Sequence, residues 1–405
     1  MAPAAASSSA AAAAAASASD LGHLLRPLHW AAVLRHPHSA AASPLFFRLC
    51  TVAMASFAFT STCSEVTVLF RDGTADLDAF TLTLSVVDTN TIWLFRMAHT
   101  VACERAYHKL AHQVRNDFGE FLTLEDLPLL RGQSRVVRRF ALAYIWFGVG
   151  ACAYYLVSPV SAEGLPFILA LPFDATRPLS FAATWLFCTV TCLHVVVMTM
   201  VLDSLNVSLI AQLRIQLTLL SGKIVGIAKE MSEKPVRSSE TSLYSELHYR
   251  LEKCIRHHQT IIKNADLLER SLGAMLLAQS VAIGAAVCFQ MFQIATSANG
   301  LQQTGKFCCY LFAMLAELYV YCWFGDDLIT ESENVAQAAY DAVTSLQECP
   351  VSIKRSLLLL MHRAQRPLRI TAGGFFPLSR ESFVSVVNVS YSFFAILRNF
   401  KDEEE

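Results

Sequence analysis

Charged residues are scarce in this chain. Asp, Glu, Lys and Arg make up 16% of its 405 residues, whereas 54% are hydrophobic, and the mean hydropathy is +0.42. A soluble domain carries about a quarter charged residues. The composition therefore excludes an ordinary soluble domain and predicts a polytopic membrane protein, surrounded by the lipid bilayer. The net charge of -1 and the lack of a basic tail give no sign of a nucleic-acid partner.

The sequence also lacks the motifs of enzymes and metal sites. It has no Ser/His/Asp or Cys/His nucleophile context, no phosphate-binding Gly loop and no CxxC pair with partner histidines. The 12 cysteines are scattered, many of them in apolar runs where a thiol behaves as a small hydrophobe. We expect no enzymatic activity, no cofactor, no metal and no disulfide framework. The adjacent His257 and His258 would point about 100° apart on a helix, so we assign them to a solvated helix face.

The N-terminal segment, residues 1–20, is nearly all Ala and Ser. Because it has no basic n-region and no Leu-rich core, we expect a disordered segment and not a cleaved signal peptide. Between Leu21 and Leu28 leucines recur at helical spacing. This pattern predicts a short interfacial helix that is interrupted at Pro27.

Seven apolar stretches are long enough to cross a bilayer as helices. The fourth runs for about 40 residues without a breaker, and as a helix it would extend about 60 Å, roughly twice the hydrocarbon core. Its second half must project beyond the membrane, and the fifth and sixth stretches carry polar extensions of the same kind. The seven expected spans are 46–70, 77–101, 136–160, 179–220, 272–295, 307–324 and 378–400.

Two acidic residues, Asp88 and Glu317, fall inside these spans. Ionisable groups at membrane depth suggest function, so a proton or ion site is one hypothesis. The other, which we favour, is a neutralised or hydrogen-bonded structural role, because no basic residue lies one turn away on the same helix.

The distribution of Arg and Lys predicts the orientation of the chain. An odd number of spans puts the two ends on opposite sides of the membrane, and basic residues collect on the cytoplasmic side. With the N-terminus inside, the outer segments hold only Arg71, Arg177, Lys306, Arg398 and Lys401. We therefore predict an all-α protein of seven transmembrane helices with a cytoplasmic N-terminus and an extracellular C-terminus.

The expected domain order follows from these spans. The inner ends of helices 4–7 would form a cytoplasmic helical anchor domain, rich enough in Leu and Ile to serve as an assembly surface. A Gly/Pro-containing break precedes the last helix, for which Ser379 is the expected N-cap. The segments are a cytoplasmic N-terminal segment (1–45), helices 1–4 (46–220), a short cytoplasmic linker (221–241), helices 5–6 with cytoplasmic extensions (242–346), a cytoplasmic helix and break (350–377), the last helix (378–400) and an extracellular acidic tail (401–405).

The last helix carries a polar stripe with two bulky apolar residues at its edge. At about 100° per residue the polar face holds Ser385, Asn388, Ser392 and Asn399, with Ile396 and Phe400 beside them. The opposite side holds Phe383, Val387, Phe394 and Leu397. Such a helix suits the wall of a water-filled pore. A polar contact between packed membrane helices is the alternative, and it is the more frequent use of such a stripe.

Motifs over roughly the last hundred residues are similar to those of the insect odorant receptors. In order they are Tyr321-Cys-Trp-Phe-Gly325, Ala339-Tyr340, Met361-His-Arg-Ala-Gln-Arg-Pro367, Phe376-Pro-Leu-Ser-Arg-Glu-Ser-Phe383, Ser390-Tyr-Ser-Phe-Phe394 and Leu397-Arg-Asn-Phe400. The rest of the chain resembles the family only in topology. One departure is Thr344, where the family often has a Trp. Ser392-Phe393 and Asn399-Phe400 also resemble a relaxed form of the signature of the related gustatory receptors.

The resemblance implies a heterotetrameric, ligand-gated, non-selective cation channel. The chain would be the ligand-tuning subunit beside an odorant co-receptor, because the linker 221–241 lacks the large insertion of the co-receptor. Monovalent and divalent cations would pass through the pore. The protein would be located in the plasma membrane, in the dendrites of olfactory sensory neurons. By motif alignment the gate falls on Ile396 and Phe400. A gustatory-type homotetrameric channel is the alternative, whereas a transporter is disfavoured because no repeated halves are found.

The resemblance also places a pocket for a small volatile organic ligand in the outer halves of spans two, three, four and six. An aromatic, sulfur-bearing and nearly uncharged lining suits such a ligand, although each residue could instead serve ordinary packing. The predicted lining is Phe80, Leu84, Val87, Phe147, Ala151, Tyr154, Phe181, Trp185, Cys188, Phe307, Tyr310, Leu311 and Met314.

Overall fold

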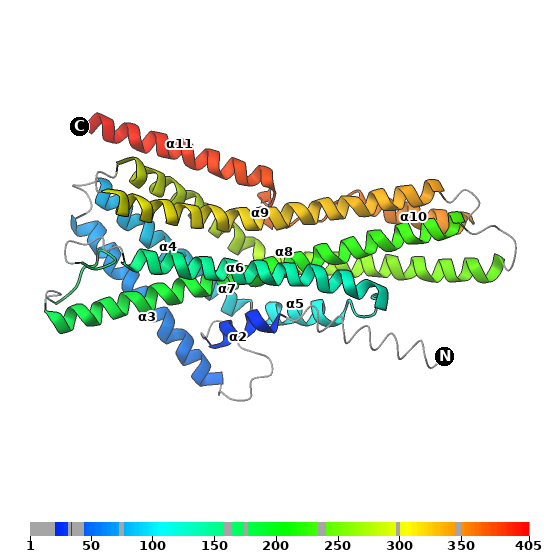
Figure 1. Cartoon of the computed structure of the whole chain (residues 1–405), viewed down its shortest axis with the longest axis horizontal. Helices are drawn as coiled ribbons and strands as arrows, with labels where there is room; N and C mark the ends of the chain where they lie inside the picture. The colour runs from blue at the N-terminus through cyan, green and yellow to red at the C-terminus, as the bar shows by residue number, and fades with distance from the viewer. Residues whose placement is uncertain are drawn as a thin grey trace.

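The computed structural model describes most of the chain and is almost entirely helical (Figure 1). The described residues are 21–30, 34, 44–72, 77–157, 164–173, 177–233, 240–296, 300–345 and 350–404. The expected disorder of residues 1–20 lies outside them. The helices are α2 (Gly22–Trp30), α3 (Pro44–Asp72), α4 (Leu77–Ala102), α5 (Glu104–Asn116), the 3-10 turn η1 (Leu124–Asp126), α6 (Leu127–Val157), α7 (Pro178–Glu233), α8 (Glu240–Thr296), α9 (Gly300–Ser345), α10 (Val351–Ala364) and α11 (Arg380–Glu404).

Among the described helices, 6 are long and apolar enough to cross a membrane: α3, α6, α7, α8, α9 and α11. These correspond to six of the seven expected spans. The remaining one, α4, carries Asp88 and Arg96 in its interior and is not among these six. It packs against both α3 and α8.

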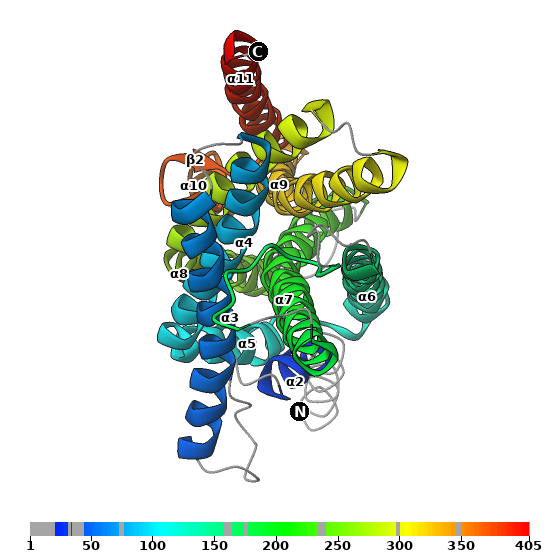
Figure 2. The ribbon, with the colours of Figure 1, turned by 90° about the vertical axis from the view of Figure 1, so that its left-hand side faces the viewer.

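Helix α7 forms the centre of the bundle. Every residue from Met200 to Leu220 is buried except Arg214 and Thr218, which are half-buried. A helix that is buried all round needs no single apolar stripe, and the leucines and isoleucines of α7 are spread over all its sides. Its buried polar residues, such as Asp203 and Asn206, bond to neighbouring helices. Figure 2 shows α7 surrounded by α2, α3, α6 and α9. The hydrophobic core of the protein is therefore built around α7.

Three helices extend well beyond the thickness of a bilayer. α7, α8 and α9 contain 56, 57 and 46 residues. At the right of Figure 1 the far ends of α8 and α9 pack against α10, and α7 packs against α8 and α9. We call this part, made of the second half of α7, the first half of α8, the second half of α9 and α10, the distal bundle.

The distal bundle departs from the sequence-based expectations at two points. α7 continues to Glu233, past the expected start of the linker at residue 221, because Ile224 and Ile227 are buried and Lys223 pairs with Asp126 at 2.8 Å. The assignment of His257 and His258 to a solvated face is wrong, since both are buried. The His257 ring stacks on Phe121 with centroids 4.9 Å apart and lies 3.0 Å from Gln216 Oε1.

Helix α2 also differs from its prediction. It runs from Gly22 to Trp30 without interruption at Pro27. Leu24 and Leu28 are buried, and the helix packs against α7. Burial of these leucines holds the helix in place although Pro27 cannot donate a backbone hydrogen bond.

The expected break before the last helix is a small antiparallel hairpin, β1 (Thr371–Ala372) and β2 (Phe376–Pro377). Its turn needs Gly373 and Gly374, whose φ angles are 60° and 81°, a region that L side chains rarely adopt. The expected N-cap is confirmed: Ser379 Oγ accepts the Ser382 N–H at 3.1 Å. The hairpin therefore lets α11 start in a fixed direction.

The start of α11 is held against α9 by close packing and by ion pairs. A Cβ on Gly325 would lie 2.5 Å from the Leu378 carbonyl oxygen, so only glycine allows this approach. The Arg380 side chain pairs with Asp326 at 3.1 Å and with Asp327 at 3.2 Å, and it stacks over Trp323 at 4.1 Å. The N-terminal end of α11 is thus held against α9, whereas the rest of the helix packs against α8.

Candidate functional site

A cavity of about 110 Å³ lies inside the bundle, between α3, α4, α6, α7 and α9. Its walls are mainly aromatic, aliphatic and sulfur-bearing. Such a surface binds a small apolar molecule mainly by removing it from water.

The structure divides the predicted pocket residues into two groups. Those that line the cavity are Ala151, Tyr154, Cys188, Tyr310 and Met314. Those that lie outside its lining are Phe80, Leu84, Val87, Phe147, Phe181, Trp185, Phe307 and Leu311. Trp185, for example, is 39% exposed, and Phe147 packs edge-on against Phe312. The division follows helix rotation, which hydrophobic periodicity alone does not determine.

Two charged residues that were not among the predicted pocket residues also line the cavity. Glu65 of α3 is buried and accepts hydrogen bonds from Ser61 Oγ at 3.1 Å and Asn90 Nδ2 at 3.0 Å. Lys306, expected on an outer segment, is buried, with Nζ 3.6 Å from the centre of the Tyr155 ring. An acid inside the first apolar span was the signal that could have identified Glu65.

Hydroxyl and thiol groups complete the polar part of the cavity wall. The Tyr310 hydroxyl is hydrogen-bonded to the Thr89 hydroxyl. Cys152 of α6 and Cys192 of α7 place their Sγ atoms 3.4 Å apart. The cavity therefore offers an apolar volume with a few directed polar groups, which is the usual make-up of a small-molecule site.

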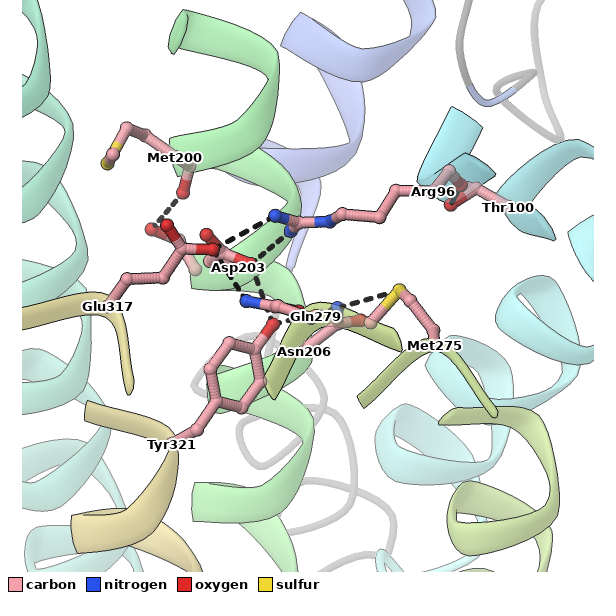
Figure 3. Close-up of polar contacts among 10 residues, drawn as sticks. Arg96, Thr100, Met200, Asp203, Asn206, Met275, Gln279, Glu317 and Tyr321 are labelled. Carbon is pink, nitrogen blue, oxygen red and sulfur yellow. Dashed lines mark hydrogen bonds and ion pairs between the residues drawn. The ribbon is translucent and has the colours of Figure 1, made fainter. Parts of the chain in front are cut away.

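Below the cavity, a buried polar cluster joins four helices (Figure 3). The Arg96 guanidinium of α4 pairs with Asp203 of α7 and, at 3.0 Å, with Glu317 Oε1 of α9. Gln279 of α8 donates to the same Glu317 oxygen at 2.6 Å. The basic partner of Glu317 is thus on another helix, and the spacing of residues along α9 gives no sign of it. Asp88, by contrast, is half-buried and stands apart from this cluster.

The predicted pore residues are exposed on α11, and three of them, Ser385, Ile396 and Phe400, line a groove between α11 and α8. Ile396 and Phe400 are 52% and 59% exposed. The polar residues Ser385, Asn388, Ser392 and Asn399 are also exposed. The residues expected on the opposite face are half-buried: Phe383, Val387, Phe394 and Leu397. Phe383 packs edge-on against Tyr319 of α9, with centroids 5.3 Å apart.

The free end of α11 is tied to α4. Lys401 Nζ lies 2.8 Å from Asp78 Oδ2. The helix continues to Glu404, so the residues expected as an acidic tail extend the helix in its described part. Along one side, a groove of about 770 Å³ separates α11 from α8 and is lined by Val281, Phe289, Phe393 and Ile396 among others.

A family model described as 7tm Odorant receptor matches residues 76–391. The chain belongs to the odorant receptor family. This odorant receptor is therefore a multi-pass membrane protein of olfaction, from a family of receptors rather than enzymes.

Its curated relatives come from insects. Odorant receptor Or2 of Anopheles gambiae is 24% identical over 310 residues, which are 75% of this chain and 80% of that receptor. Odorant receptor 13a of Drosophila melanogaster is 28% identical over 253 residues, 59% of each chain. Among solved structures, the olfactory receptor OR5 of Machilis hrabei in complex with eugenol is similar in fold, with a TM-score of 0.79 and 13% identity over 94% of this chain and 96% of that one.

Proposed function

We propose that this odorant receptor is the odorant-binding subunit of a heteromeric, odorant-gated, non-selective cation channel. A small volatile molecule binds in the cavity and opens a pore lined by α11. The polar stripe of α11 carries the proposal, because it is exposed along the helix in a single chain. A polar stripe on a membrane helix needs water or another subunit beside it.

The cavity supports a ligand that is apolar with one polar group. The aromatic and sulfur-bearing wall favours a hydrocarbon body. Lys306 offers a donor to an oxygen of the ligand. The Thr89 hydroxyl, by contrast, donates to the Ser85 carbonyl, and the Tyr310 hydroxyl donates to Thr89. A carbonyl- or hydroxyl-bearing volatile therefore fits this lining better than a pure hydrocarbon.

The gate is the pair Ile396 and Phe400. Several copies of α11 around one axis bring these side chains together, and an apolar ring closes a pore because an ion does not shed its hydration shell into hydrocarbon. Asn388, Ser392 and Asn399 supply neutral dipoles, which solvate monovalent and divalent cations with little selectivity. The ligand opens the channel by binding the open arrangement more tightly than the closed one.

In the membrane, α4 also spans the bilayer and brings the number of spanning helices to seven. Its N-terminal end lies outside. The pairing of Arg96 inside the bundle supports this assignment, since a charge at membrane depth requires such a partner. The excess of Arg and Lys then places the N-terminus and the distal bundle in the cytoplasm and the end of α11 outside. The distal bundle is the anchor domain of the assembly, in the plasma membrane of olfactory dendrites.

The partner is an odorant co-receptor subunit in a heterotetramer. The short interval between the end of α7 at Glu233 and the start of α8 at Glu240 supports the tuning-subunit assignment. A gustatory-type homotetramer is the second candidate, favoured by the pairs Ser392-Phe393 and Asn399-Phe400. The two differ in whether this chain makes a channel alone.

Expression in cells with and without an odorant co-receptor tests the proposal. We expect volatile-evoked cation currents only when both subunits are present, with surface labelling of this chain as the control. Currents from this chain alone would establish the homotetramer instead. A panel of volatiles that evokes no current from well-expressed pairs would contradict both.

A further inference from the structure

The first half of α6 presents four exposed arginines on one side, which we call the arginine face. They are Arg131, Arg135, Arg138 and Arg139. At about 100° per residue they fall within an arc of about 100°. None of them forms an ion pair within the described residues, and Arg135 Nε donates only to the Arg131 carbonyl oxygen, at 3.3 Å. Like charges at such spacings repel one another, so an anion from outside the chain would stabilise this face.

Contacts on the opposite side of α6 determine which way the arginine face points. Gln133 Oε1 accepts a hydrogen bond from Arg214 of α7 at 2.9 Å, and Ser134 Oγ accepts one from Gln212 at 3.4 Å. Val137 is buried between these residues and the rest of the bundle. Figure 2 shows α6 at the edge of the bundle beside α7. The arginine face is therefore directed away from the protein.

The sequence of α6 gives the depth of the arginine face in the membrane. No charged residue occurs from Phe140 to Val157, the end of the helix. This stretch is about 27 Å long as a helix, close to the roughly 30 Å of the hydrocarbon core. Arg139 then lies at the boundary of the core, and Arg131 lies about 12 Å further out. Since the headgroup layer is about 5–8 Å thick on each side, the arginines extend through it and slightly beyond.

The same side of α6 continues into the hydrocarbon as an apolar surface. Leu142 and Trp146 fall within the arc of the arginines and are 42% and 72% exposed. Acyl chains are as apolar as leucine, so these side chains lie against lipid. One face of α6 thus offers cations at the level of the headgroups and apolar groups below them. A phospholipid has its charges and its chains in the same order.

We propose that the arginine face binds a phosphoinositide whose headgroup carries two phosphate monoesters. Two monoesters and one phosphodiester bring a charge of about -4 to -5, which balances four guanidinium groups. Phosphatidylserine has a single net negative charge and a headgroup that projects less far from the membrane. Guanidinium groups bind phosphate oxygens in a bidentate manner. The leaflet is the cytoplasmic one, where basic segments beside spanning helices attract such lipids, and this part rests on the orientation proposed above.

Thermal unfolding of the full-length chain in nanodiscs of three compositions tests the site. They contain phosphatidylcholine alone, phosphatidylcholine with a phosphoinositide bisphosphate, or phosphatidylcholine with enough phosphatidylserine to give the same net charge. Because a ligand of the folded state stabilises it by mass action, we expect the highest midpoint with the phosphoinositide. Equal midpoints with the two anionic lipids would overturn the proposal, since the attraction would then be unspecific. Soluble inositol trisphosphate, added to the neutral nanodiscs, should stabilise far less, and an equal shift would refute a lipid ligand.

Two double variants with the same change of charge locate the site. Arg135→Gln combined with Arg138→Gln should raise the phosphoinositide content needed for half of the shift by about thirtyfold. Arg355→Gln combined with Arg363→Gln, both exposed on α10, is the matched control and should leave it unchanged. An unchanged requirement in the folded α6 variant would refute the site, and the three nanodisc compositions decide alone if that variant does not fold. Neither measurement uses current or a co-receptor, so failure of the lipid site is distinguishable from failure of the channel.

Discussion

Polar side chains occur in two very different environments in the spanning part of this receptor. In the cluster around Arg96, charged groups are buried and paired across helices of one chain. On α11, Asn388, Ser392 and Asn399 are exposed, and no part of the described chain covers them. The first set stabilises the tertiary structure of a single chain. The second set has a use only beside water or another subunit, so exposure distinguishes residues of the fold from residues of the assembly.

The largest expected difference between these regions is in stability. Arg96→Met leaves the carboxylates of Asp203 and Glu317 without their guanidinium partner, and breaking such a buried pair costs about 3–5 kcal/mol. Asn399→Ala, on the exposed stripe, should change stability by less than about 0.5 kcal/mol. Thermal unfolding and surface labelling of both variants measure this. Equal loss of surface expression would contradict the comparison.

A similar contrast exists in the distal bundle, and it indicates which residues are available for assembly. Leu357 and Leu360 are buried within the chain, whereas Leu358 and Leu359 of α10 are exposed. Leu357→Ala should destabilise the chain by about 2–5 kcal/mol, because it leaves a cavity. The double change Leu358→Asp and Leu359→Asp should leave the fold intact and reduce co-purification with the co-receptor. Co-purification at the level of the unsubstituted chain would remove this surface from the assembly.

The gate residues should affect the open fraction and not the fold. Ile396→Ser adds a hydroxyl to the apolar constriction, so water enters the closed pore more readily. A shift of the open fraction from about 1% to about 10% without ligand corresponds to about 1.4 kcal/mol. Basal current in cells with both subunits, normalised to surface labelling, measures this. Val384→Ser, also exposed on α11 but outside the predicted stripe, is the control and should show no such leak.

The smallest expected effect concerns ligand choice. Lys306→Met should weaken the response to carbonyl- or hydroxyl-bearing volatiles by about tenfold, the equivalent of one charged hydrogen bond. Lys306→Arg should retain part of it. Trp185→Ala should shift potency by less than about threefold, because Trp185 lies outside the cavity lining. Dose–response curves decide, and a larger shift for Trp185→Ala than for Lys306→Met would place the binding site elsewhere.

Sequence reasoning was most successful where the information is local. The apolar runs gave the long helices, and the break before α11 and its cap at Ser379 follow from turn and capping preferences. Contacts between distant segments were not accessible. Glu317 pairs with Arg96 across 221 residues, and the burial of His257 depends on Phe121 in a separate segment.

The candidate cavity shows the same limit. Tyr310 and Met314 line it, one turn apart on α9, whereas the intervening Leu311 does not. Periodicity identifies such faces but not which of them turns inward. Lys306 was missed because it lies just before an apolar run and was assigned to an outer segment. Glu65 was missed because an acid near the end of the first apolar run was left unexplained.

Water accessibility of single cysteines on α11 tests the pore assignment most directly. Cysteine is placed at Ser392, Asn399 or Phe394 in the assembled channel, and the rate of modification by a charged, membrane-impermeant thiol reagent is measured with and without ligand. The account predicts that Ser392→Cys and Asn399→Cys react faster when ligand is present, whereas Phe394→Cys does not react. Fast reaction at Phe394→Cys, with Ser392→Cys and Asn399→Cys inert, would show that another face of α11 lines the pore and would contradict the account.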